Sequence, residues 1–90
     1  MVSRHVNVVN TLGLHARAAA RFVKLASQFH CSIKVTRGAR TVDGKSILGL
    51  LLLAAARGTA ITITADGDDE VEALDAIEAL MARGFEDVVA

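Results

Sequence analysis

Ile61-Thr62-Ile63-Thr64-Ala65 alternates strictly between apolar and polar side chains. A period of two puts the apolar side chains on one face, so this segment predicts a β-strand with one buried face and one face in water. Residues 5–8 and 32–36 alternate in the same way, and residues 40–42 form a shorter candidate strand. The turn Arg37-Gly38-Ala39 is short enough to join the strands at 32–36 and 40–42 in an antiparallel hairpin.

The segment that follows His15 has the periodicity of an amphipathic helix. Its apolar stripe comprises Ala19, Phe22, Val23, Ala26 and Phe29. Its opposite face is basic and polar and carries Arg17, Arg21, Lys24 and Gln28. We therefore expect a helix that packs against the sheet by one face and presents a basic stripe on the other.

A second helix is predicted over the apolar run 47–56, which is preceded by Ser46 as a suitable N-cap and followed by Gly58 as a suitable C-terminal stop. We expect this helix to be short and mostly buried. Its leucines are too consecutive for one buried stripe, however, so some of them, with Leu48 and Leu51 as candidates, should emerge as an apolar patch for a protein partner. The alternative is that the whole run is core.

A third helix is predicted after Asp69, which suits its N-cap, with Glu72 at N3. Acidic residues in the first turn complement the helix dipole, and Arg83 with Gly84 suits the C-terminal end. The expected core residues of this helix are Val71, Leu74, Ile77 and Met81.

The predicted order of elements is βαββαβα. Because one face of the sheet is polar, all three helices should cover the other face, which gives an α+β open-faced two-layer sandwich with a four-stranded antiparallel sheet. Ninety residues, 52% of them apolar, suit one compact domain, 1–90. The longest apolar run, 47–56, is too short to cross a bilayer, and the first residues lack a secretory signal. Cys31, the single cysteine, cannot form an internal disulfide, so we expect a cytoplasmic protein.

The net charge of zero hides an asymmetry along the chain. Residues 1–58 hold nine of the ten Lys and Arg and one Asp, and residues 59–90 hold the remaining base and nine acids, so the halves sum to +8 and −8. A basic half could bind nucleic acid, but single-strand readers stack bases on exposed aromatic side chains, and this chain has only three phenylalanines. Acidic protein partners fit better than nucleic acid.

The segment Asn10-Thr11-Leu12-Gly13-Leu14-His15-Ala16-Arg17 leads from the first strand into the first helix. His15 stands where Ser, Thr, Asp or Asn is the usual N-cap, and such a break in a local rule tends to mark function. The positive helix end disfavours an imidazolium, so we expect a neutral, nucleophilic ring. A phosphoryl group on that ring would bring negative charge to a helix N-terminus with Arg17 one turn inward. His15 could equally be a structural cap.

Together these features favour a phosphoryl relay. The transition state of phosphoryl transfer is loose, so a carrier needs one nucleophile and a few well-placed donors. The chain holds no Gly-rich phosphate loop, no paired carboxylates and no metal-binding pair beside His30 and Cys31. We therefore expect no metal and no cofactor, and a carrier in a phosphotransferase relay rather than a stand-alone enzyme. His5 and His30 are expected to be inert.

The chain resembles the histidine-containing phosphocarrier (HPr) family of the bacterial phosphoenolpyruvate-dependent phosphotransferase system. The resemblance runs nearly end to end and is carried by three segments: Gly13-Leu14-His15-Ala16-Arg17, Gly44-Lys45-Ser46-Ile47-Leu48-Gly49-Leu50 and Ala65-Asp66-Gly67-Asp68-Asp69-Glu70. It implies the same βαββαβα fold. It also implies that an enzyme I-type protein phosphorylates His15 on Nδ1, that Arg17 steadies the group, and that a IIA-type domain receives it.

Further residue roles follow from the resemblance. Ser46 would be a site of regulatory phosphorylation by an HPr kinase/phosphorylase present in some lineages, besides its simpler role as a helix cap. The first two helices would form the docking face, with Leu48 and Leu51 at its centre and Arg21 and Lys24 at its rim. The alternative for Arg21 and Lys24 is a merely solvated face; steering of acidic partners would make transfer fall with salt.

One position departs from the family pattern. The family usually has proline directly after the Arg of this loop, and this chain has Ala18. Alanine gives up about 0.4–1 kcal/mol of chain restriction but is an excellent helix former, so we expect a looser loop with its chemistry intact.

Two rival functions remain at the sequence level. One is a nitrogen-type regulatory phosphocarrier, which would share the chemistry and differ in its partners; the Arg83-Gly84-Phe85-Glu86-Asp87 segment weakly favours it. The other is a regulatory binding module that does not transfer phosphate. No dimer seam is evident, so we expect a monomer.

Overall fold

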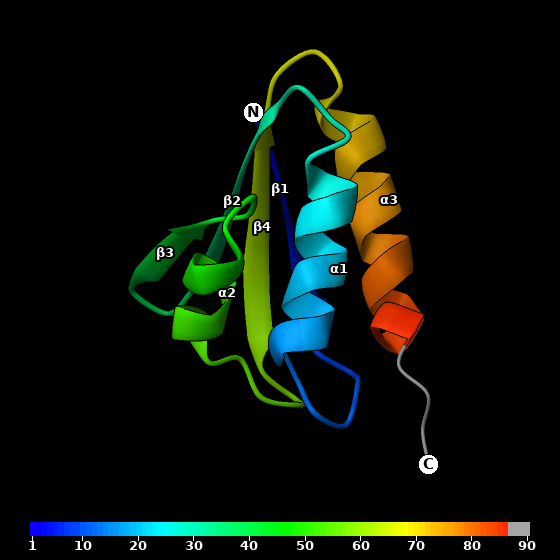
Figure 1. Ribbon diagram of the computed structural model, residues 1–90. Helices are drawn as coiled ribbons and strands as arrows, with labels where there is room; N and C mark the ends of the chain where they lie inside the picture. The colour runs from blue at the N-terminus through cyan, green and yellow to red at the C-terminus, as the bar shows by residue number, and fades with distance from the viewer. Residues whose placement is uncertain (87–90) are drawn as a thin grey trace.

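The computed structural model of the protein describes residues 1–86. Its elements are β1 (Val2–Asn7), α1 (Ala16–Ala26), β2 (Ser32–Arg37), β3 (Arg40–Asp43), α2 (Ile47–Leu53), β4 (Ala60–Asp66), α3 (Glu70–Ala82) and a final 3-10 turn, η1 (Gly84–Glu86) (Figure 1). The predicted order βαββαβα is confirmed, and η1 is an addition to it. No helix within residues 1–86 is both long and apolar enough to span a membrane.

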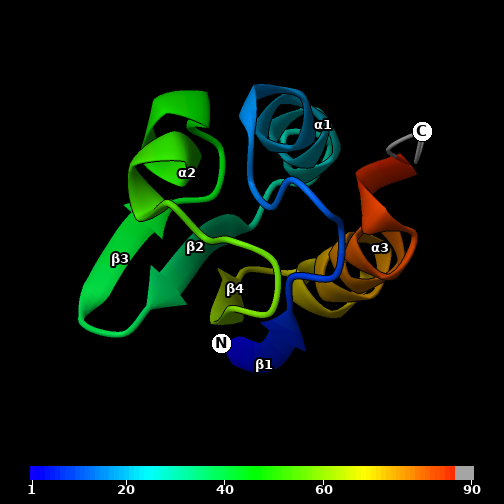
Figure 2. The ribbon, with the colours of Figure 1, turned by 90° about the horizontal axis from the view of Figure 1, so that it is seen from below.

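The four strands form one antiparallel sheet in the order β1-β4-β2-β3. In β4 the isoleucines and Ala65 are buried, and the threonines lie on the wetter face, as the alternation predicts. Hydroxyl pairs connect neighbouring strands on that face, with Ser3 Oγ 2.8 Å from Thr64 Oγ1 and Thr36 Oγ1 2.9 Å from Thr41 Oγ1. Figure 2 shows the three α-helices together on one side of the sheet, which confirms the open-faced two-layer sandwich.

The core lies between the sheet and the helices. Phe22 of α1 is fully buried there, as are Leu74, Ile77 and Met81 of α3, which confirms most of the predicted stripe. Val71 is the exception, because it is 47% exposed. At 100° per residue it lies about 120° from the centre of the buried face of α3, where Ala73 and Leu80 complete the packing instead. Phe29 packs against the core from a turn beyond the end of α1, not from the helix.

The predicted start of α3 is correct in place but wrong in mechanism. Asp69 stands at the N-cap position, yet its side chain makes no capping hydrogen bond. Its carboxylate instead accepts the backbone N–H groups of His30 and Cys31, at 2.8 and 2.9 Å, which ties the turn before β2 to the start of α3. These hydrogen bonds, that of His30 first, lower the pKa of Asp69 below its ordinary value. The reciprocal turn contact comes from Glu70, whose Oε1 accepts the N–H of Gly67, rather than from Glu72.

The predicted end of α2 is wrong. The helix stops at Leu53, before the expected end at residue 56, and Ala54 takes a left-handed conformation with φ of 54°. The last carbonyls of α2 are bound by side chains of the β2–β3 hairpin, and the residues that follow are bound to the loop before α1. These tertiary contacts end the helix earlier than its apolar sequence suggests, so Gly58 is not its stop.

Candidate functional site

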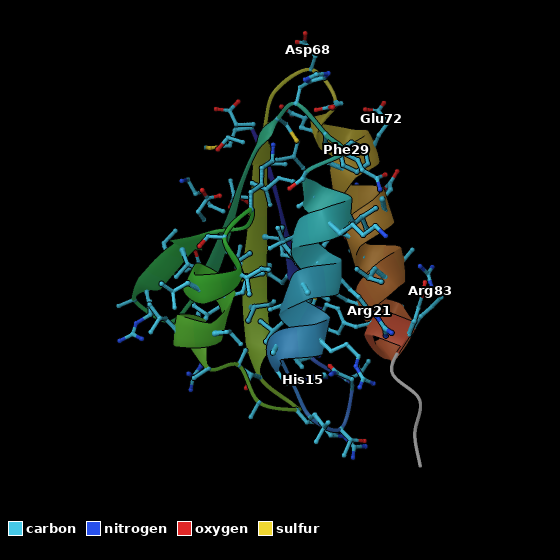
Figure 3. All side chains as sticks on the ribbon, in the orientation of Figure 1. His15, Arg21, Phe29, Asp68, Glu72 and Arg83 are labelled. Carbon is cyan, nitrogen blue, oxygen red and sulfur yellow. The ribbon has the colours of Figure 1, made fainter. Side chains whose placement is uncertain are left out.

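His15 is the N-cap of α1, as predicted. Its backbone is extended, with φ −75° and ψ 177°, and its carbonyl accepts the N–H of Ala19 at 2.9 Å. The ring turns back over the helix end, where Nδ1 accepts the backbone N–H of Arg17 at 3.2 Å. A ring nitrogen that accepts a hydrogen bond uses a lone pair for it, so this contact corresponds to the tautomer with its proton on Nε2. Nδ1 therefore lies against an N–H group at the positive end of α1, and Figure 3 shows His15 at the start of this helix.

The loop before His15 is held from two sides. Asn10 closes it, because its Nδ2 donates to the carbonyl of Gly13 at 2.7 Å while the N–H of Gly13 donates to the carbonyl of Asn10 at 3.1 Å. Leu14 is buried and donates its N–H to the carbonyl of Ala55, beyond the end of α2, at 2.9 Å. Gly13 has φ of +66°, and a Cβ there would lie 2.5 Å from the Ala55 oxygen, so no other residue fits.

The N-terminus of α1 can hold an anion. Its first turn contains no acidic residue. The first N–H to bond within the helix is that of Ala19, so the N–H groups of Ala16, Arg17 and Ala18 precede the helical ladder. Arg17 is exposed one position beyond Ala16 and adds a full positive charge to the same end. A phosphoryl group on Nδ1 would meet backbone donors, the helix dipole and a guanidinium at once.

The basic stripe of α1 contains two different kinds of residue. Lys24 is exposed, as expected for a solvated or partner-facing side chain. Arg21 is half-buried, and its Nη1 donates to the carbonyl of Phe85 at 2.5 Å, so that it reaches from α1 toward the end of α3 (Figure 3). Phe85 is fully buried with φ of 58° in the left-handed region. The sequence does not reveal this contact, since only Gly84 signals a turn there.

Ser46 caps α2 as predicted, because its Oγ accepts the N–H of Gly49 at 3.0 Å. Burial along α2 differs from the prediction: only Leu50 and Leu53 are buried. Leu48 and Leu51 are 67% and 37% exposed, and Leu52, which is not among the predicted patch residues, is 57% exposed. We call Leu48, Leu51 and Leu52 the leucine patch. Its exposure agrees with the expected emergence of part of this run, and a helix this short has only one side to bury.

Comparisons with known proteins agree with this geometry. The family described as "PTS HPr component phosphorylation site" matches residues 2–83. The Phosphocarrier protein HPr of Cupriavidus necator is 47% identical over 85 residues, which cover 94% of this chain and 96% of that protein. The crystal structure of HPr-C-His from Thermoanaerobacter tengcongensis superposes with a TM-score of 0.94 at 37% identity, covering 99% of this chain and 100% of that one.

A second crystal structure, of an HPr dimer from Thermoanaerobacter tengcongensis, superposes with a TM-score of 0.78 at 38% identity and covers 97% of this chain and 100% of that one. The family match over residues 2–83 includes β1 and β2, the strands before and after α1, and all three α-helices. Fold, sequence and the histidine at the start of α1 lead to the same assignment. The chain belongs to the HPr family of phosphocarrier proteins of the phosphotransferase system.

Proposed function

We propose that His15 accepts a phosphoryl group on Nδ1 from an enzyme I-type protein charged by phosphoenolpyruvate, and passes it to IIA-type domains. The observation that supports the proposal is the hydrogen bond from the Arg17 N–H to Nδ1, which holds this nitrogen at the N-terminus of α1. Such a relay would operate in the cytoplasm, as the sequence predicts.

The chemical step uses one electron pair. The Nδ1 lone pair leaves its hydrogen bond with Arg17 N–H and attacks phosphorus, so that the N–P bond forms while the bond from phosphorus to the donor atom breaks and its electron pair stays on the donor. The Nε2 proton remains in place. The released Arg17 N–H can then donate to a phosphoryl oxygen, and the guanidinium of the same residue offsets the arriving charge. Transfer to the acceptor reverses these events on a second protein.

The docking face would consist of the leucine patch and the basic stripe of α1. Exposed leucines supply apolar area at the centre, and Lys24 supplies positive charge at the rim. Arg21 belongs to this rim by its place in the stripe, although its hydrogen bond to Phe85 gives it an internal role as well. Acidic partners should therefore be steered to the face, with transfer rates that fall as salt rises.

Ser46 is proposed as a regulatory site for an HPr kinase/phosphorylase. Its Oγ already lies at the N-terminus of α2 and accepts one backbone N–H, so a phosphate there is compatible with the helix end. The added negative charge would lie on the helix that carries the leucine patch and would weaken docking of acidic partners. We propose a monomeric carrier; the dimer among the similar structures makes the oligomeric state worth measuring at working concentration.

The test is phosphorylation in a defined mixture. The chain is incubated with phosphoenolpyruvate and an enzyme I-type protein, and its mass is measured before and after mild acid. We expect one acid-labile phosphoryl group, lost completely in His15→Ala and retained in His5→Ala and His30→Ala. A chain that gains no adduct would be a regulatory module without transfer. Phosphotransfer from the charged chain to sugar-specific or to nitrogen-type IIA domains then distinguishes the two relay types.

A further inference from the structure

Arg37 and Arg40 bind the C-terminal end of α2. They are direct partners across the β2–β3 hairpin. Arg37 Nη1 donates to the carbonyl of Leu53 at 2.9 Å and to that of Ala54 at 3.3 Å, and Arg40 Nη1 donates to the carbonyl of Leu52 at 2.7 Å. We call these three hydrogen bonds the arginine latch. In Figure 1 the hairpin and α2 lie side by side.

The latch resolves two local conflicts. Like charges directly opposite each other in a hairpin repel, and a left-handed alanine such as Ala54 is strained. The negative end of the α2 dipole offsets the charge repulsion, because its carbonyls accept hydrogen bonds from both guanidinium groups. The hydrogen bonds that Arg37 donates to the carbonyls of Leu53 and Ala54, on either side of the α2 end, offset the backbone strain at Ala54. The open cavity of about 780 Å³ beside the hairpin therefore needs no bound anion to explain its two arginines.

The latch also lies next to the support of the His15 loop. Arg37 holds the carbonyl of Ala54, and the carbonyl of the next residue, Ala55, accepts the N–H of Leu14. Leu52, on the other side, is both a member of the leucine patch and the acceptor for Arg40. Hydrogen bonds to the four consecutive carbonyls of residues 52–55 thus join the hairpin, the exposed leucines and the residue before His15.

We propose that Arg37 and Arg40 are positioning residues, which fix the leucine patch relative to His15 so that a docked donor protein presents its phosphoryl group to Nδ1. This inference rests on the proposed function. Neither arginine touches the reacting atoms, so their removal should impair docked transfer and spare the reactivity of the imidazole itself. Because the donor protein must contact the leucine patch and reach Nδ1 at the same time, a displaced patch loses contacts in the docked complex and weakens docking.

The experiment compares two phosphoryl donors with the full chain. Phosphoramidate, a small molecule, reports the reactivity of His15 without docking when His5→Ala and His30→Ala are present in every variant, and a phosphorylated enzyme I-type protein reports docked transfer. For Arg37→Ala/Arg40→Ala we expect KM for the protein donor to rise about tenfold with a small change in kcat, and an unchanged rate with phosphoramidate. Arg37→Lys/Arg40→Lys keeps the charge but not the planar fork and should recover only part of the loss.

Two controls separate positioning from charge and from stability. Lys34→Ala/Arg57→Ala removes the same charge from exposed positions outside the latch and should leave KM nearly unchanged. Adding Ala54→Gly to the latch variant relieves the left-handed strain and raises its stability, but does not replace the hydrogen bonds, so KM should stay high.

Three results would overturn the positioning role while leaving His15 as the acceptor. These are a normal KM in the latch variant, an equal loss with both donors, and full recovery of KM by Ala54→Gly. If the unmodified chain accepts no phosphoryl group from either donor, the proposed function and this inference both fall.

Discussion

The N-termini of α1 and α3 offer the same backbone donors but treat charge in opposite ways. The first turn of α3 contains Glu70 and Glu72, so its positive end is matched by the chain itself. The first turn of α1 contains no acid and is capped by Nδ1 of His15, which accepts the N–H of Arg17. In Figure 3 His15 lies at one end of the molecule, and Asp68 and Glu72 lie at the other. The first turn of α3 supplies acids to its own positive helix end, whereas the first turn of α1 supplies none, as the proposed phosphoryl site requires.

The difference between the two helix ends should disappear if the first turn of α1 is given the charge pattern of α3. In Ala16→Glu an exposed residue of the first turn becomes acidic. We expect the helix to gain about 0.5 kcal/mol from its dipole, while phosphorylation by the protein donor slows about tenfold through like-charge repulsion. Urea unfolding and a phosphorylation time course measure the two effects. Ala20→Glu, one turn further in, is the charge-matched control, and a rate of Ala16→Glu equal to that of Ala20→Glu would contradict the open-end interpretation.

At the N-terminus of α3, lowering the pH tests the role of the acidic side chains. The pKa of Asp69 is lowered in the folded chain, foremost by the His30 N–H. The stabilisation from this carboxylate is therefore present above its unfolded pKa, ordinarily 3.8, and is lost as the pH falls through the lower folded value. Asp69→Asn should be less stable than the parent at neutral pH, and the two stabilities should converge in acid.

Thermal unfolding from pH 7 to pH 2 tests this prediction for Asp69. Asp68→Asn, an exposed neighbour with the same change of charge, is the control and should follow the parent. Parallel curves for Asp69→Asn and the parent at all pH values would show that the carboxylate does not hold the turn before β2. Phosphorylation of His15 should be unaffected, because the two helix ends act separately.

The smallest effect is expected at Ala18, a fully buried residue in the first turn of α1. Ala18→Pro restricts the unfolded chain, which should add about 0.4–1 kcal/mol of stability, but it removes one N–H from the open helix end. These effects oppose each other in the reaction, and we expect a transfer rate within about threefold of the parent. A rate far above the parent would mean that the loop with alanine is too loose for efficient transfer.

The parts of this account that the sequence predicts are those set by local rules. Alternation in β4 and the cap residues His15 and Ser46 depend on neighbours along the chain, and all three are confirmed. The end of α2 could not be predicted, because two arginines from the hairpin determine it.

The same limit applies to Asp69 and Arg21. Asp69 fits a cap by sequence, but its carboxylate accepts the backbone N–H groups of His30 and Cys31, before β2, instead of those of its own helix. Arg21 aligns with the basic stripe by helical spacing, yet its partner is a backbone carbonyl in the left-handed turn of η1. Tertiary hydrogen bonds to backbone groups carry no signal in residue type or spacing, so such contacts require the structure.

The central claim, that the nitrogen facing the α1 N-terminus is the phosphoryl acceptor, is tested most directly by ¹⁵N NMR of histidine-labelled protein. The chain is phosphorylated with phosphoenolpyruvate and an enzyme I-type protein, and the spectrum is recorded before the adduct hydrolyses. The account predicts coupling to phosphorus at Nδ1 of His15 alone. Coupling at Nε2 of His15, or at a nitrogen of His5 or His30, would contradict it.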